Sequence, residues 1–187
     1  MPVMDSEPTR GLLEREECAL VVIDLQNRLL PHIHDHERVV RNTTKLVHFA
    51  KIAGLPILWT EQENLGETPD EILEHLSGVE PIRKIEFGSF GCEAFQRAAA
   101  ALGKGTLLLA GIEAHICVAQ TALGALPRYR VQVIADAVSS RDPIHRDVAF
   151  SRLQQAGVEL TCTEMLFYEI LRRAGTDEFR AVLPLVK

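Results

Sequence analysis

The stretch that decides the fold of this chain is AGIEAHICVAQTALGAL, residues 110–126. It follows the apolar run TLLL at Thr106–Leu109, so a buried strand passes through Gly111 into a short polar turn and then into an apolar helix. Cys117 stands where that helix is expected to begin. Ligands of parallel α/β domains bind just outside the carboxyl ends of the strands. The stretch therefore predicts a parallel α/β fold with Cys117 at the functional edge of its sheet.

The same alternation of short apolar runs and helical patterns continues along the chain. Most of the runs are apolar throughout, which is typical of parallel strands covered on both faces. Right-handed crossovers between such strands predict a three-layer α/β/α domain with a central, mostly parallel six-stranded sheet. The expected strands are 19–24, 55–60, 81–87, 106–111, 131–136 and 158–163, and the expected helices lie near 37–53, 69–77, 91–102, 116–127, 142–156, 164–174 and 176–183.

The chain is long enough for one domain with a sizeable core, because it has 187 residues. We expect residues 1–17, which are polar and acidic, to form a flexible lead-in, and residues 18–187 to form a single domain that includes the C-terminal helices. No linker, repeat or low-complexity segment interrupts this second part.

Composition argues against several classes of partner. The formal net charge of -6 disfavours nucleic acid or an anionic membrane as the main partner. No apolar run approaches the ~20 residues of a membrane span, and the acidic start does not resemble a secretory signal. The 4 cysteines include no CxxC pair, so zinc-ribbon and thioredoxin-like interpretations fail. These features favour a cytoplasmic protein with reduced thiols.

Three reactive side chains fall at or near the ends of predicted strands: Asp24, Lys84 and Cys117. A cysteine at a helix start meets unpaired N–H groups and the positive end of the helix dipole, and a nearby lysine lowers the thiol pKa further. A carboxylate within reach can take the thiol proton and later pass it to a leaving group. The same N–H groups can hold an oxyanion when the thiolate attacks a carbonyl.

Each of these residues also has an ordinary structural interpretation. A lone cysteine on an apolar helix usually packs in the core. Asp24 alone could cap a turn, and Lys84 alone could be a solvated lysine. The functional hypothesis is favoured because all three residues fall at the same edge of the predicted sheet.

Three motifs resemble the isochorismatase-like cysteine hydrolase superfamily: ALVVIDLQNRLLP from Ala19, RKIEFGSF from Arg83 and the stretch from Ala110 quoted above. The resemblance covers about Ala19 to Thr163. Within the superfamily, LWTEQENLGETPDEI and GIEAHICV are similar to isochorismatase domain-containing proteins and YcaC-like hydrolases.

The resemblance implies a role for each reactive residue. Cys117 is the nucleophile, Asp24 is the base, and Lys84 stabilises the thiolate and orients the aspartate. It also implies a non-proline cis peptide at Ile112–Glu113, which aims the N–H groups of Glu113 and Cys117 at an oxyanion. The implied sheet order places the first and fourth strands side by side, so that Asp24 faces Cys117.

One departure from the superfamily concerns metal. Its nicotinamidases bind a metal through an Asp-x-His pair after the second strand and a further histidine, whereas residues 60–64 here read TEQEN, with no histidine between His48 and His75. We therefore expect no metal site and no cofactor, and nicotinamidase activity is disfavoured. Isochorismatase activity proper is disfavoured because no clear basic cluster for a dicarboxylate is visible.

Position alone suggests further residues that line a substrate pocket: Gln26, Leu29, Trp59, Gln62, Phe90, His115 and Thr121. Two other signals compete with this interpretation. His32, His34 and His36 alternate and could bind a metal on a strand, although a loop is expected there. His115 precedes Cys117 by two residues and could form a Cys–His dyad with it.

The sequence thus predicts a cysteine-dependent hydrolase that cleaves a small molecule, most simply an amide-type C–N bond, through a thioester on Cys117. The resemblance further implies a homo-oligomer. A second hypothesis is a catalytically quiet oligomeric interaction protein, with the apolar stretches 165–175 and 179–187 covering the subunit contact. A third is a redox-responsive protein in which Cys117 is oxidised rather than acylated.

Overall fold

The computed structural model describes residues 11–76 and 78–187. Within them, a six-stranded sheet has the order β3-β2-β1-β4-β5-β6, and every strand pairs in parallel with its neighbour. The expected central parallel sheet is therefore confirmed, and β1 lies beside β4. The strands are β1 (Cys18–Ile23), β2 (Ile57–Gln62), β3 (Ile82–Lys84), β4 (Thr106–Ile112), β5 (Arg130–Ser139) and β6 (Glu159–Thr161).

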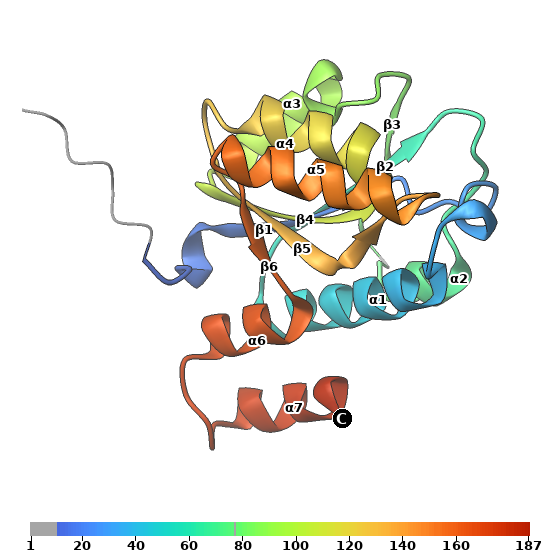
Figure 1. The fold of residues 1–187 in the computed structure, drawn as a ribbon. Helices are drawn as coiled ribbons and strands as arrows, with labels where there is room; N and C mark the ends of the chain where they lie inside the picture. Colours follow the sequence, from blue (N-terminus) through green and yellow to red (C-terminus); the bar gives the residue numbers. More distant parts are fainter. Residues whose placement is uncertain (1–10, 77) are drawn as a thin grey trace, which may run out of the picture.

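Helices cover both faces of the sheet, as the three-layer prediction requires (Figure 1). One side, called here the α4 face, carries α3 (Glu93–Ala101), α4 (Ala119–Ala125) and α5 (Pro143–Gln155). The other, the α1 face, carries α1 (His36–Ala53), α2 (Asp70–Leu73), α6 (Thr163–Leu171) and α7 (Asp177–Val186). Short 3-10 turns span Arg15–Glu17, Leu30–His32 and Ser89–Gly91, and a π-helical turn spans Ala114–Val118.

The two faces hold separate clusters of buried side chains because successive residues of a strand point to opposite sides. In β1, Leu20 and Val22 join the cluster on the α1 face, whereas Ala19, Val21 and Ile23 join the cluster on the α4 face. All six residues of β1 are buried. Burial on both faces explains why the run reads as continuously apolar rather than alternating.

Gly111 permits β1 and β4 to approach closely at their carboxyl ends. It pairs with Ile23, its φ is +123°, and a Cβ at this position would lie 2.0 Å from the carbonyl oxygen of Ile23. A side chain cannot occupy that space, and few L-residues adopt that φ. The glycine therefore lets the two strands deliver Asp24 and the turn after β4 to one place.

Two predicted elements are shorter in the structure. The third strand was expected over 81–87 but ends at Lys84. It leaves the sheet there because the backbone carbonyls of Glu86 and Phe87 turn back to accept hydrogen bonds from the Lys84 ammonium. The helix expected near 69–77 is the single turn α2, followed by turns that bond residues three apart, such as the N–H of His75 to the carbonyl of Ile72.

The prediction of a flexible lead-in is wrong for residues 11–17, while residues 1–10 lie outside the described part. Leu13 is fully buried, and its N–H donates to the carboxylate of Glu169 at 2.7 Å. Arg15 pairs with Glu178 at 2.7 Å. The segment is held because its one inward apolar side chain and its charges meet partners on α6 and α7, which local sequence alone does not reveal.

The apolar C-terminal stretches are used largely within the chain itself. Phe167 of α6 stacks on Phe49 of α1, with ring centroids 4.2 Å apart, and Val182 of α7 is buried in the same cluster. Met165 and Tyr168 of α6 stay exposed. The hypothesis that these stretches mainly cover a subunit contact therefore loses much of its apolar surface to packing on α1.

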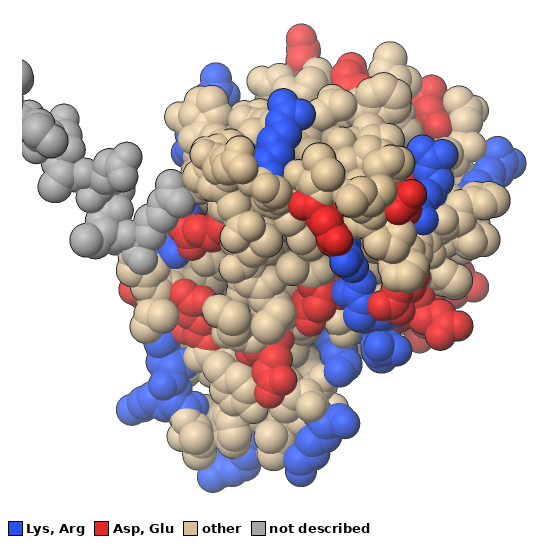
Figure 2. Space-filling model, viewed as in Figure 1, with Lys and Arg blue, Asp and Glu red and all other residues tan. Residues whose placement is uncertain are grey.

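Surface charge is mixed on the face drawn in Figure 2, where acidic and basic side chains lie close to one another. Neighbouring charges of opposite sign largely offset each other's field beyond the ~8–10 Å over which salt screens them. None of the helices in the described residues has the length and apolar character required to cross a membrane.

Candidate active site

Asp24 lies directly after β1 and is fully buried. Its φ is +49°, a left-handed conformation that turns the chain sharply away from the sheet. Its N–H donates to the carbonyl of Thr60 at 3.2 Å, and its Oδ1 accepts from the Thr60 hydroxyl at 2.7 Å. β2 therefore fixes the carboxylate through both the backbone and the side chain of one threonine.

Lys84, the last residue of β3, is 2% exposed and donates to Oδ2 of Asp24 at 2.6 Å. Its Nζ also donates to Oε1 of Gln62 at 2.8 Å and to the carbonyls of Glu86 and Phe87 at 3.0 and 3.2 Å. An ammonium has three N–H groups, so four oxygens more than satisfy it. A buried cation with this many acceptors is stabilised as a charge and holds one position.

Cys117 lies in the π-helical turn between β4 and α4 and is 7% exposed. The Asp24 carboxylate and the Lys84 ammonium both lie near enough to its thiol to shift the pKa of that thiol. The structure thus brings together all three residues that the sequence places at strand ends. They arrive from β1, β3 and the turn after β4.

The thiol of Cys117 is not primed in the way its sequence position suggests. Its pKa is raised to about 12, chiefly by burial and then by the charge of Asp24, while Lys84 and a backbone hydrogen bond from Glu113 lower it only in part. The expectation of a lowered pKa is therefore wrong for the resting protein. The reason is that the sulfur is desolvated and faces a carboxylate, and these two effects outweigh the lysine and the helix terminus.

The turn that leads to Cys117 is held in place by hydrogen bonds with the segment after β5. The peptide bond between Ile112 and Glu113 is cis, where the resemblance implies such a bond. The buried carboxylate of Glu113 accepts from the backbone N–H and the Nε of Arg141, at 3.0 and 3.1 Å. These contacts tie the turn after β4 to the segment after β5.

His115 lies against Ser140 and His145 rather than pairing with the cysteine. Its Nδ1 is 3.0 Å from the Ser140 hydroxyl, and its ring centroid is 4.6 Å from that of His145. Burial lowers its pKa, as does the neighbouring His145. These contacts give no support to a Cys–His dyad.

Of the residues predicted to line a substrate pocket, three lie on the side of the sheet where Cys117 lies. Gln62 contacts Lys84 and also donates to the carbonyl of Ile85 at 2.8 Å. Phe90 packs on the α4 face. Thr121 is fully buried, and its hydroxyl is used in hydrogen bonds with Ser89 at 2.9 and 3.1 Å.

The other predicted lining residues take different roles. Trp59 and Leu29 pack with the cluster on the α1 face, because Trp59 is out of phase with Thr60 and Gln62 along β2. The Gln26 side chain is used internally: its Nε2 donates to the carbonyls of Gln62 and Gly66, and its Oε1 accepts from the N–H of Gln62. Gln26 therefore holds the loop after β2.

Thr60 was missed as a functional residue, and so were the carbonyls of Glu86 and Phe87. Thr60 could have been found, because it ends the second apolar run and so stands beside Asp24 at the same edge of the predicted sheet. The two carbonyls carry no side-chain signal. Their role depends on where the chain turns after Lys84.

The alternating histidines do not share one face of a strand, because His32 ends a 3-10 turn and His36 begins α1. The backbone N–H of His34 donates to the carbonyl of Ser140, and its own carbonyl accepts from the Ser139 hydroxyl, so the segment is a loop tied to the end of β5. Across the described ranges 11–76 and 78–187, no group of three or more His, Cys, Asp or Glu side chains is arranged to hold a metal ion.

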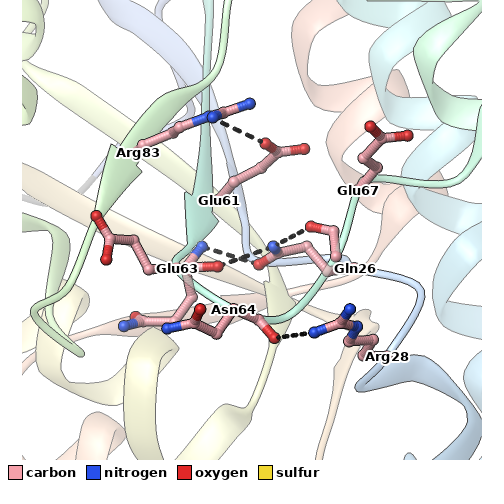
Figure 3. A pocket seen from close by; sticks show the side chains of 9 residues that line it. Gln26, Arg28, Glu61, Glu63, Asn64, Glu67 and Arg83 are labelled. Carbon is pink, nitrogen blue, oxygen red and sulfur yellow. Dashed lines mark hydrogen bonds and ion pairs between the residues drawn. The ribbon is translucent and has the colours of Figure 1, made fainter.

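A pocket of about 370 Å³ opens beside the three reactive residues rather than over Cys117. Figure 3 shows it from close by, with the Gln26 side chain and its hydrogen bonds to the backbone in the centre. Gln62 belongs to both regions, since it lines the pocket and also bonds to Lys84. The pocket is lined by Gln26, Arg28, Glu61, Gln62, Glu63, Asn64, Gly66, Glu67 and Arg83.

A parallel sheet with a buried aspartate, lysine and cysteine at its carboxyl edge defines the class of protein, and comparison with known proteins gives the family. The chain belongs to the isochorismatase family, because the family's "Isochorismatase domain" matches residues 18–165. Members of this family are generally hydrolases. Isochorismatase domain-containing protein 2 of Danio rerio is 34% identical over 180 residues, which cover 94% of this chain and 90% of that protein.

Solved structures show the same fold. The YcaC gene product of Escherichia coli, described as an octameric hydrolase of unknown specificity, superposes with a TM-score of 0.89 at 26% identity, covering 96% of this chain and 91% of that one. N-carbamoylsarcosine amidase of Thermoplasma acidophilum superposes with a TM-score of 0.66 at 25% identity, covering 79% of this chain and 97% of that one.

Proposed function

We propose that this protein is a cysteine-dependent hydrolase that cleaves an amide-type C–N bond of a small molecule. The observation that carries the proposal is that Cys117 is buried close enough to Asp24 to feel its charge, and that Oδ2 of Asp24 accepts from Lys84 at 2.6 Å. The similarity to an amidase and to a hydrolase of unknown specificity supports the reaction class.

The raised pKa of Cys117 determines when the thiol loses its proton in the proposed reaction. At neutral pH the residue is a thiol, so the sulfur gains its nucleophilicity as it attacks, when Asp24 takes the proton. The C–S bond forms while the carbonyl C=O becomes an oxyanion. The N–H groups of Glu113 and Cys117 are the proposed donors to that oxyanion.

The tetrahedral intermediate then collapses to products. Asp24 passes the proton to the leaving nitrogen, the C–N bond breaks, and an amine or ammonia departs from a thioester on Cys117. Asp24 next removes a proton from water, and the resulting hydroxide attacks the thioester. The C–S bond breaks to give the carboxylic acid, and Asp24 returns its proton to the departing sulfur, which restores the thiol. Lys84 keeps its charge throughout and holds the aspartate in place.

The same geometry disfavours the redox hypothesis. Peroxide reacts with thiolates, and a pKa of about 12 leaves little thiolate at neutral pH. The catalytically quiet alternative leaves unexplained why a buried ion pair and a buried thiol share one hydrogen-bonded network. Burial of such a pair is costly and is retained where it serves a specific role.

The test is a screen of small primary amides and carbamoyl compounds, following ammonia release and the intact mass of the acid-quenched protein. We expect a mass gain on Cys117 equal to the acyl group. Cys117→Ala should lose both signals, whereas Cys92→Ala should keep them. Cys92 is a matched control because it is also buried and also precedes a helix, α3. Full turnover by Cys117→Ala on any substrate found would contradict the proposal.

We further propose a homo-oligomer in a reducing, cytoplasmic setting. The YcaC relative is described as an octamer, and all 4 cysteines of this chain are free thiols. Light scattering at micromolar concentration should give a mass that is a multiple of 20.8 kDa. A monomeric mass at that concentration would contradict this part of the proposal.

A further inference from the structure

The pocket beside the proposed catalytic residues adjoins a second recess. The second recess has a volume of about 340 Å³, and the two share Glu61, Glu67 and Arg83 as a common wall. Beyond that wall the lining of the second recess is mostly apolar, with Trp59, Leu73, Leu76, Val79 and Pro81 among its described residues. We call the two recesses together the Glu61 cleft. One half of this cleft is charged and the other half is apolar.

Glu61 is the buried charge of this cleft. It is 7% exposed, and its Oε1 accepts from the N–H and the hydroxyl of Thr68, both at 3.1 Å. Among the described residues, Oε2 pairs with Arg83, whose Nε lies 3.8 Å away, which is too long for a hydrogen bond. The Arg83 side chain is itself 74% exposed. Oε2 of this nearly buried residue therefore has no hydrogen-bond donor among the described residues and is open to the cleft that Glu61 lines, where a ligand donor can bind it.

The charges that line the cleft favour a cationic ligand. Carboxylates of Glu61, Glu63 and Glu67 line the first recess and that of Glu80 lines the second, against two guanidinium groups, those of Arg28 and Arg83. Arg28 is already engaged, since it donates to the carbonyl of Asn64 at 3.1 Å. Figure 3 shows the carboxyl groups of Glu61 and Glu67 on the same side of Gln26, and Arg28 on the opposite side.

We propose that the Glu61 cleft binds a small organic monocation, an ammonium or guanidinium group on an apolar carbon frame. The cationic head lies between Glu61 and Glu67 and supplies the hydrogen bond that Oε2 of Glu61 lacks. The carbon frame lies in the apolar half, against Trp59. Charge-assisted hydrogen bonds and burial of the carbon frame both contribute to affinity. This binding function is separate from the hydrolysis proposed at Cys117.

The chain provides its own reporter, because Trp59 is the 1 tryptophan in the sequence and it lines the apolar half. The experiment titrates the protein with n-hexylammonium and follows tryptophan fluorescence and, in parallel, heat by calorimetry. We expect a saturable response to hexylammonium that is about tenfold weaker with hexan-1-ol, which lacks the charge, and absent with hexanoate. Absence of saturation by both methods would overturn the proposal, as would equal affinity for the alcohol.

Matched variants locate the binding site. Glu61→Gln keeps an acceptor for Thr68 but removes the charge, and Glu67→Gln changes an exposed side chain that cannot disturb the core. Each should weaken hexylammonium binding by about tenfold. Glu71→Gln is the control, because Glu71 is exposed on the nearby α2 but does not line the cleft. An equal loss of affinity in Glu71→Gln would show that hexylammonium responds only to the overall negative charge of this region. That result would overturn the proposed binding site.

Cys117→Ala separates this inference from the proposed hydrolysis, since an amine is also a product of amide cleavage. Cys117 does not line either recess, so the variant should bind hexylammonium with unchanged affinity. Loss of binding in Cys117→Ala would place the amine at the catalytic residues and overturn the Glu61 cleft. A failed amide screen, by contrast, would leave the binding result intact.

Discussion

The proposed catalytic residues and the Glu61 cleft lie side by side, and they differ in how fully their buried charges are hydrogen-bonded. Both oxygens of Asp24 accept strong hydrogen bonds, and Lys84 donates to four acceptors. In the cleft, one oxygen of Glu61 has no hydrogen-bond donor, and its nearest cation is 3.8 Å away. The comparison teaches that a fully satisfied network positions groups for chemistry, whereas a half-satisfied carboxylate on an open cavity marks a place for a ligand.

The largest expected effect comes from substitution of Asp24, which belongs to the catalytic region and not to the Glu61 cleft. Asp24→Asn should lower amide turnover by about 100-fold or more, because the base is lost. It should also make Cys117 react faster with iodoacetamide at neutral pH, since both the charge and the hydrogen bond of Asp24 raise the pKa of this thiol. Turnover assays and mass-spectrometric mapping of the alkylated cysteine measure the two effects.

The control for this prediction lies in the cleft. Glu61→Gln removes a buried carboxylate of similar exposure without touching the thiol, so turnover and alkylation should both stay unchanged. If Asp24→Asn instead slowed alkylation, the aspartate would not be acting on the Cys117 thiol in the way we describe.

The next largest effect concerns Gly111, where β1 and β4 approach closely. This approach forms the catalytic region but not the Glu61 cleft. Gly111→Ala should cost more than about 3 kcal/mol of unfolding free energy, because the new Cβ would lie 2.0 Å from a backbone oxygen and the φ is +123°. Gly103→Ala is the control: its φ is +62°, but no atom lies within 4 Å of the added Cβ. It should cost about 1 kcal/mol. Denaturant unfolding measures both, and equal costs would mean that strain rather than contact dominates.

The pH dependence of Cys117 tests the protonation state assigned to it. Alkylation of this thiol should rise about tenfold for each pH unit from pH 7 upward, without a plateau near the ~8.5 of an exposed thiol. The free energy of unfolding should also depend on the ionisation of the Cys117 thiol. The folded pKa of about 12 lies above the 9.0 of an ordinary thiol, so the neutral thiol favours the folded state below pH 9. That contribution is lost as the pH rises from 9 toward 12.

The contribution of Cys18 to this pH dependence must be separated from that of Cys117, because burial raises the pKa of Cys18 to about 12 as well. Cys117→Ala and Cys18→Ala should each reduce the fall in stability above pH 9. A plateau of Cys117 alkylation below pH 8 would show a primed thiolate and would contradict the assignment.

The smallest effect compares two arginines at the edges of the two regions. Arg141 donates its Nε to the buried carboxylate of Glu113 at 3.1 Å, so Arg141→Gln should cost about 1 kcal/mol. Arg83 lies 3.8 Å from Glu61 and is mostly exposed, so Arg83→Gln should change unfolding midpoints very little. A larger loss in Arg83→Gln would mean that Glu61 depends on this arginine and is not waiting for a ligand.

Much of the catalytic region follows from local pattern. The apolar runs ending at Asp24 and beginning at Thr106 indicate two parallel strands. What failed were predictions that depend on the direction of single side chains. Trp59 and Gln62 stand three positions apart on β2 and point to opposite faces, so only one of them lies with the catalytic residues. Position after a strand does not distinguish them.

The amino-acid sequence by itself determined the order of the elements, the three-layer fold and the placement of Asp24, Lys84 and Cys117 at one edge of the sheet, because strand periodicity and parallel crossovers act over short stretches of chain. Only the tertiary structure decided that burial raises the pKa of Cys117, that residues 11–17 are docked, and that one oxygen of Glu61 faces the cleft without a donor among the described residues. These properties depend on desolvation and on partners that lie far away in the sequence, and no local pattern encodes them.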